Sequence, residues 1–66
     1  MQIVVNGEPQ ATDANTLREL CEALGFSGDA RVATAVNGDF VARTARETHV
    51  LKDADRIEIV APRQGG

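Results

Sequence analysis

The stretch NTLRELCEALG, residues 15–25, predicts one amphipathic helix with both of its ends marked. Its apolar residues follow the i, i+3, i+4, i+7 spacing of a single helical face: Leu17, Leu20, Cys21 and Leu24. Thr16 followed by Glu19 is a capping-box pattern, and Gly25 suits the left-handed conformation after the last helical turn. This helix decides the fold, because it is available to cover one face of whatever sheet the remaining segments form.

Short strands and turns surround this helix. The dipeptides Asn6-Gly7 and Asn37-Gly38 readily take the positive φ angles of tight turns, so each predicts a hairpin. Pro62 withholds a backbone donor and ends the last strand. In chain order we expect a strand at 2–6, its return through Pro9 to about Thr12, the helix, a loop at 26–30, strands at 31–37 and 40–43, an irregular surface turn at 44–51, a polar turn at 52–55 and a strand at 56–61.

This order of elements is the β-grasp, or ubiquitin-like, arrangement. It is an α+β fold in which one helix covers one face of a small mixed sheet. The first and last strands, QIVVN and RIEIVA, are the most apolar, which fits a parallel pair at the centre of the sheet. We expect a β-grasp domain at 1–61 and a flexible C-terminal tail at 62–66 that leaves from the middle of the sheet.

Size and composition exclude several classes of function. A chain of 66 residues forms one domain at most, with a small core and little room for an enclosed active site. The formal charge of −3, with no basic cluster and neither Trp nor Tyr, argues against nucleic-acid binding. No apolar run approaches a membrane span, and MQIVVNGE is not a signal peptide. One cysteine, without an internal disulfide, fits a reducing cytoplasm, and we expect a cytoplasmic protein that is a monomer on its own.

Three further residue types carry no predicted chemistry. Cys21 lies on the apolar helix face, where a buried cysteine behaves as a small hydrophobe and not as a sulfur relay. His49 is the only histidine and has no neighbouring Cys or second His, so no metal site is expected. Asp53 and Asp55 lack the ligand series of a calcium loop, and a solvated turn is expected there.

Strand alternation predicts a sheet face that the helix leaves open. If Ile57 and Ile59 point to the helix, then Glu58 points away from it, because successive strand residues alternate between faces. The same counting gives a candidate docking patch for a partner on this face: Val4, Ala35, Phe40 and Val60. Arg63, just before the chain end, either steers the terminus on a partner or is simply exposed.

The segment AVNGDFVARTARETHVLKDADRIEIVAPRQGG, residues 35–66, resembles the C-terminal half of the thiamine-biosynthesis sulfur carrier family, ThiS. The start MQIVVNGE and the helix TLRELCEAL extend the resemblance over nearly the whole chain. Two positions depart from the family pattern: Ala42 replaces a frequent proline, and Ala54 replaces a usual glycine before Asp55. Alanine fits a turn position of negative φ, which is the conformation expected at both.

The resemblance implies a function for the terminal Gly65-Gly66. A ubiquitin-activating-type enzyme, using ATP and Mg, would adenylate the carboxylate of Gly66. Sulfur from a donor protein would then replace AMP, and the thiocarboxylate would supply the thiazole of thiamine through thiazole synthase. Without Cβ atoms, Gly65 and Gly66 could enter a narrow channel in that enzyme. The chain has no GxxxxGK run, so no cofactor is expected to bind to it.

The same residues leave other functions open. A molybdopterin-synthase small subunit, or a carrier for another sulfur pathway, would use the same tail. A protein modifier would instead join Gly66 to lysines of its targets; because Lys52 is the single lysine, a self-linked polymer would have one branch point. A plain β-grasp binding module would be indifferent to its C-terminus.

Overall fold

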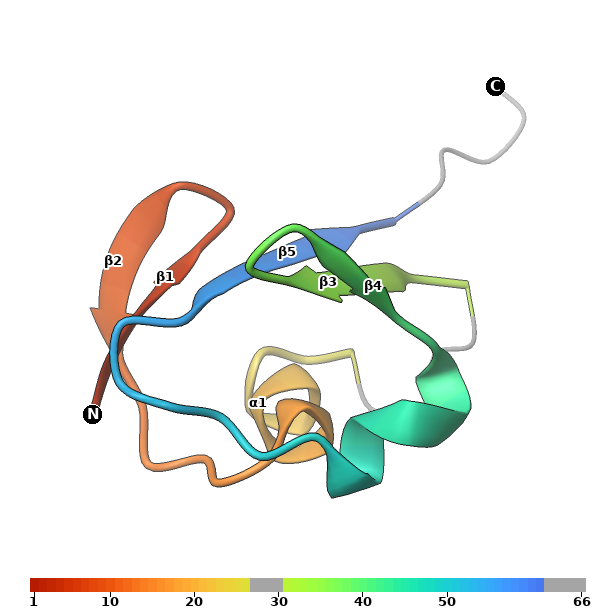
Figure 1. Ribbon diagram of the computed structural model, residues 1–66, viewed down its shortest axis with the longest axis horizontal. Helices are drawn as coiled ribbons and strands as arrows, with labels where there is room; N and C mark the ends of the chain where they lie inside the picture. Colours follow the sequence, from red (N-terminus) through yellow and green to blue (C-terminus); the bar gives the residue numbers. More distant parts are fainter. Residues whose placement is uncertain (27–30, 62–66) are drawn as a thin grey trace.

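The computed structural model describes residues 1–26 and 31–61 of the chain, which form a five-stranded sheet with helical segments on one side (Figure 1). The sheet order is β2-β1-β5-β3-β4, which confirms the predicted β-grasp fold. In chain order the elements are β1 (Gln2–Val5), β2 (Glu8–Ala11), α1 (Leu17–Ala23), β3 (Ala33–Val36), β4 (Asp39–Val41), the 3-10 helix η1 (Arg43–Thr48) and β5 (Arg56–Val60).

Strand β5 lies at the centre of the sheet. It runs parallel to β1, with Val5 opposite Ile57, and antiparallel to β3, with Thr34 opposite Ile59. The prediction that the first and last strands are parallel neighbours in the middle of the sheet is therefore confirmed. Both edges of β5 have backbone partners, so the strand that leads toward the chain end is held from two sides.

Both Asn-Gly turns are confirmed, and their asparagine side chains bind β5. Asn6 and Asn37 have φ angles of 51° and 52°, and the glycines that follow also have positive φ. Asn6 Nδ2 donates to the Ile59 carbonyl at 3.1 Å, and Asn6 Oδ1 accepts from the Ile59 N–H at 2.8 Å. On the other edge of β5, Asn37 Oδ1 accepts from the Arg56 N–H at 3.0 Å. The two side chains thus replace missing strand neighbours at opposite ends of β5.

Helix α1 packs its apolar face against the sheet, below it in the view of Figure 1. Leu17, Leu20 and Cys21 are buried with the inward residues of the strands, including Ile57 and Ile59. This arrangement confirms the prediction that Leu17, Leu20 and Cys21 share the apolar helix face and that Cys21 is buried there. Leu24 is only partly buried and packs against the edge of the same core.

The predicted helix ends are also confirmed. Thr16 Oγ1 accepts from the Glu19 N–H at 3.2 Å. Glu19 Oε1 accepts from the Asn15 N–H at 2.7 Å, one residue earlier than in the standard capping box. Gly25 has a φ of 92°, and the Phe26 N–H donates to the Cys21 carbonyl at 2.8 Å, as in a Schellman motif.

The segment after β4 is not the irregular surface turn that the sequence predicted. Residues 43–48 form η1, and the side chain of Arg46 is buried there, with 6% of its surface exposed. Arg46 Nε donates to Thr34 Oγ1 at 2.9 Å, and its Nη2 donates to the Val32 carbonyl at 2.6 Å. The guanidinium therefore ties η1 to the start of β3, a role that no local sequence pattern indicates.

The turn before β5 corrects two further expectations. Asp55 is buried, not solvated, and its carboxylate accepts from Asn37 Nδ2 at 2.9 Å and from the Lys52 N–H at 2.8 Å. Ala54 has a φ of 72°, whereas a negative φ was expected. Ala42 has the expected negative φ of −66°. The Ala54 N–H donates to the Gln2 carbonyl at 2.7 Å. The carboxylates of Asp53 and Asp55, on either side of Ala54, also accept backbone hydrogen bonds, so contacts on both sides hold this strained alanine.

We predict that Ala54→Gly stabilises the domain by about 0.5 to 1 kcal/mol. A left-handed conformation costs a non-glycine residue about 1 to 2 kcal/mol, and the greater unfolded-state entropy of glycine offsets about 0.5 to 1 kcal/mol of that gain. Urea denaturation of the parent and the variant measures the difference. Ala42→Gly is the matched control, and it should lower stability because no strain is relieved there. A midpoint for Ala54→Gly at or below that of the parent would contradict the prediction.

Candidate functional site

The candidate site consists of the C-terminal tail and the sheet face from which β5 leads to it. The predicted tail residues Arg63, Gly65 and Gly66 lie outside the described residues, as does the rest of the segment 62–66. Strand β5 ends at Val60, one residue before the last described position. The part of the candidate site that the structure describes is therefore the surface around the end of β5.

The open sheet face carries two large exposed apolar side chains. Phe40 is 72% exposed and Val60 is 60% exposed, and both lie on the side of the sheet opposite α1. Phe40 pairs with Ala35 across β4 and β3, and Ala35 pairs in turn with Glu58 on β5. Val4, on β1, is half-buried on the same face. These residues share a face, as the alternation predicts, whereas their role in docking remains a prediction.

The pairing register adds residues that counting along single strands did not assign. Pro9 lies opposite Val4, and Arg56 lies on the other side of Val4. Ala33 lies opposite Val60. The face is therefore apolar near the end of β5 and becomes more polar toward Arg56. Pro9 was accessible to sequence reasoning, since counting outward from the two-residue Asn6-Gly7 turn places it opposite Val4.

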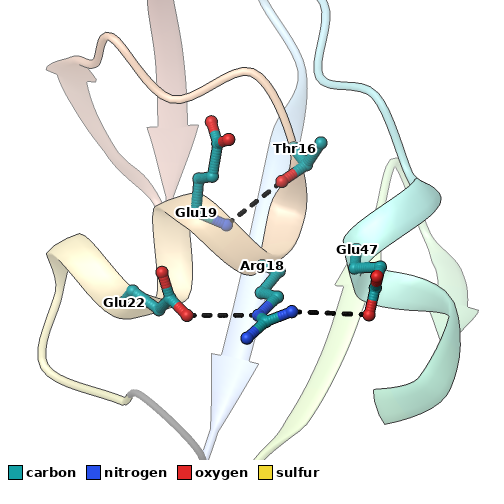
Figure 2. Close-up of a pocket in the computed structure, with 5 residues that line it drawn as sticks. All are labelled: Thr16, Arg18, Glu19, Glu22 and Glu47. Carbon is teal, nitrogen blue, oxygen red and sulfur yellow. Dashed lines mark hydrogen bonds and ion pairs between the residues drawn. The ribbon is translucent and has the colours of Figure 1, made fainter.

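A shallow hollow lies on another side of the molecule, between α1 and η1 (Figure 2). It is lined by Thr16, Arg18, Glu19, Glu22 and Glu47. Arg18 Nε pairs with Glu22 Oε2 at 3.1 Å, and Arg18 Nη1 pairs with Glu47 Oε1 at 3.4 Å. These side chains are largely exposed, so each pair contributes about 1 kcal/mol or less. Three carboxylates against one guanidinium make the hollow unfavourable for the phosphates of a nucleotide.

Residues 1–26 and 31–61 present no group of three or more His, Cys, Asp or Glu side chains that could hold a metal ion. His49 follows η1 and is half-buried, and its backbone carbonyl accepts from the Leu17 N–H at 2.9 Å. Asp53 Oδ1 accepts from the Gln2 N–H at 2.9 Å, and Asp55 binds Asn37 as described above. These residues hold the ends of elements together. No helix in the described part of the chain is long and apolar enough to cross a membrane.

Comparison with known proteins gives the family. The model of the ThiS family matches residues 3–66. The chain belongs to the ThiS family. The crystal structure of the thiamine biosynthesis protein ThiS from Geobacter metallireducens is similar over 100% of both chains, with 33% identity and a TM-score of 0.80. The NMR solution structure of a thiamine biosynthesis protein from the same organism has 30% identity and a TM-score of 0.82, covering 100% of this chain and 88% of that one. No curated protein matches the chain at a significant level.

Membership of the ThiS family agrees with the geometry of the site. The family consists of small sulfur carriers of thiamine biosynthesis, which are not themselves catalysts. In this chain the described surface offers an open sheet face and an exposed acidic hollow. An open face suits contact with another protein better than it suits the enclosure of a small substrate.

Cys21 is the one sulfur nucleophile in the chain, and its surroundings suppress its reactivity. The side chain is buried in the core, with 3% of its surface exposed. Burial raises the pKa of the Cys21 thiol above its usual value, the positive charge of Arg46 opposes that shift, and Glu22 reinforces it. The thiol therefore stays protonated at neutral pH, and a protonated thiol is a poor nucleophile.

We predict that iodoacetamide modifies Cys21 of the folded chain at least about tenfold more slowly than it modifies the unfolded chain at pH 7.5. The rate should keep rising with pH beyond the range in which the rate of the unfolded chain levels off, because the raised pKa of the Cys21 thiol extends thiolate formation to higher pH. Mass spectrometry of timed samples measures the modification, with the chain in concentrated denaturant as the control. Equal rates in the folded and unfolded states would show that Cys21 is accessible.

Proposed function

We propose that this chain carries sulfur as a thiocarboxylate on Gly66. The carboxylate oxygen of Gly66 attacks the α-phosphate of ATP in a ubiquitin-activating-type enzyme, pyrophosphate leaves, and an acyl-adenylate forms. Sulfur at the oxidation level of sulfide, delivered by a donor protein, then attacks the acyl carbon, AMP leaves, and a thiocarboxylate remains on Gly66. Thiazole synthase takes that sulfur into the thiazole of thiamine.

The match of the ThiS family model through residue 66 is the observation that carries this proposal. The matched segment includes Gly65 and Gly66, which follow the central strand β5 in the sequence. A free α-carboxyl has a reference pKa of about 3.3 to 3.7, so it is a carboxylate at neutral pH and a poor acyl donor. Adenylation by a partner supplies the leaving group that the carboxylate lacks.

The nucleotide and its magnesium ion belong to the activating enzyme in this scheme. The acidic hollow between α1 and η1 is unfavourable for phosphates, and the sequence contains no GxxxxGK run. The buried, protonated Cys21 supports transfer of sulfur directly to Gly66 without a relay on this chain. A protein with a single cysteine can work in the reducing cytoplasm, where we place it.

The activating enzyme docks on the open sheet face in this proposal. Phe40 and Val60 provide the exposed apolar surface. Ala35 lies beside Phe40, and Val4 extends the apolar surface to β1, where it lies beside Arg56. Arg63 would then act at the start of the tail, close to the same partner. Binding energy comes from the face, and the reaction takes place at the tail.

We predict that deletion of Gly65 and Gly66 abolishes thiocarboxylate formation and leaves the unfolding midpoint unchanged. Among the described residues the core extends no further than Ile59, and Gly65 and Gly66 have no side chain to bury. The test incubates the parent and the truncated chain with ATP, the activating enzyme and a sulfur donor. Intact-mass spectrometry should show replacement of oxygen by sulfur in the parent, located at Gly66, and no change in the truncated chain.

The same spectra contain the result that would overturn the proposal. Equal modification of the truncated chain would show that the reaction does not need the terminal glycines. Sulfur located at Cys21 would point to a persulfide relay instead of a thiocarboxylate. A Gly65→Ala, Gly66→Ala chain of parental length separates the need for a slim backbone from the need for length.

We predict that Phe40→Ala weakens binding to the activating enzyme by about 2 kcal/mol, or roughly 30-fold in Kd, and leaves the fold intact. An aromatic anchor at the centre of an interface contributes about this much, and Phe40 is too exposed to support the core. Calorimetric titration with the enzyme measures the change. Val50→Ala is the matched control, because Val50 is 63% exposed but lies outside the open face. Equal affinities of Phe40→Ala and the parent would remove Phe40 from the docking surface.

A further inference from the structure

The apolar end of the open sheet face contains one carboxylate, Glu58. It lies on the central strand β5, with Ala35 beside it on β3 and Val60 two residues further along its own strand. Ala35 presents only a methyl group and lies between Glu58 and Phe40. A partner that covers both Phe40 and Val60 therefore spans about 10 Å of sheet and comes to lie against Glu58 as well.

We propose that Glu58 determines which partner the face accepts, by requiring a lysine or arginine side chain of the activating enzyme opposite its carboxylate. This inference rests on the proposed function. Covering a carboxylate removes the water that solvates it. The desolvation free energy is large unless a cation pairs with the carboxylate. A protein surface that is merely apolar would match Phe40 and Val60 but would leave Glu58 unpaired. Glu58 thus rejects generic apolar partners, which gives specificity to an otherwise simple surface.

The position of Glu58 relative to the tail assigns the cation to the activating enzyme. Gly66 is eight residues beyond Glu58, and an extended chain of that length spans at most about 26 to 29 Å. An enzyme that acts on the Gly66 carboxylate while it contacts this face must lie within that distance of Glu58. The protein that fits both conditions is the one that adenylates the tail.

Arg56 makes the charge pattern directional. It lies two residues before Glu58 on β5 and beside Val4, farther from the tail. The two opposite charges follow one another along the strand that points to the chain end. An enzyme with a cation opposite Glu58 and an anion opposite Arg56 can dock in only one orientation, because a reversed orientation brings like charges together. That orientation directs the tail toward the adenylating site.

The test titrates the activating enzyme of the same organism with the parent, Glu58→Lys and Glu58→Gln, at low and high salt. We expect Glu58→Lys to weaken binding at least 100-fold and Glu58→Gln to weaken it about tenfold, with a smaller salt dependence than the parent. Glu47→Lys is the matched control. It makes the same charge change at an exposed position beside the acidic hollow, and it should bind within about twofold of the parent.

Each outcome of this titration supports or overturns the inference. Parental affinity for both Glu58 variants overturns it, even when the parent binds the enzyme and forms its thiocarboxylate, so the proposed function survives that result. A parent chain that does not bind the enzyme overturns the proposed function and this inference with it. A face that instead joins two copies of the chain, seen as a dimer that Glu58→Lys separates, also overturns it. Near-isosteric Glu58→Gln guards against misfolding of Glu58→Lys, and melting curves of both variants confirm folding.

Discussion

The backbone hydrogen bonds along both edges of β5 are the constraint on which the rest of this structure depends. Strands β1 and β3 provide most of them, but β1 stops short of the C-terminal end of β5, and β3 stops short of its N-terminal end. The side chain of Asn6 continues the β1 edge at Ile59, and the side chain of Asn37 continues the β3 edge at Arg56. The two tight turns therefore have a second role, since they complete the pairing of a strand that belongs to neither hairpin.

A central strand held in this way separates the two tasks of a sulfur carrier. Inward residues of β5, Ile57 and Ile59, anchor the core against α1, while Glu58 and Val60 on the same strand lie on the open sheet face, where we propose that the partner docks. Residues 62–66 follow this strand in the sequence, and the proposed chemistry takes place on Gly66. In the proposed mechanism, core packing, partner binding and chemistry thus all involve the segment 56–66. A partner that binds the open sheet face would therefore fix the position of the end of β5 relative to its own active site.

The features predicted from the sequence were those with a local physical cause. The spacing of Leu17, Leu20 and Cys21 predicted the helix face, and the Asn-Gly dipeptides predicted both turns. What the sequence did not reveal depends on partners distant in the chain. Arg46 is buried because Thr34 and Val32 accept its hydrogen bonds, and the positive φ of Ala54 is imposed by its neighbours against the preference of alanine. For the site, alternation predicted the open face, and the same counting places Arg56 and Ala33 on it. Which residues lie beside one another across the strands required the strand register.

The buried polar residues occur where the chain has no regular strand to position it. Arg46 fixes η1, and Asp55 fixes the turn at 52–55; together these segments connect β4 to β5. A small core could have used apolar contacts there, but such contacts are non-directional and specify position poorly. Hydrogen bonds specify position, and no buried side-chain nitrogen or oxygen among the described residues lacks a partner. Polar groups in this core therefore position the start of β5, and with it Glu58 and Val60 on the open sheet face.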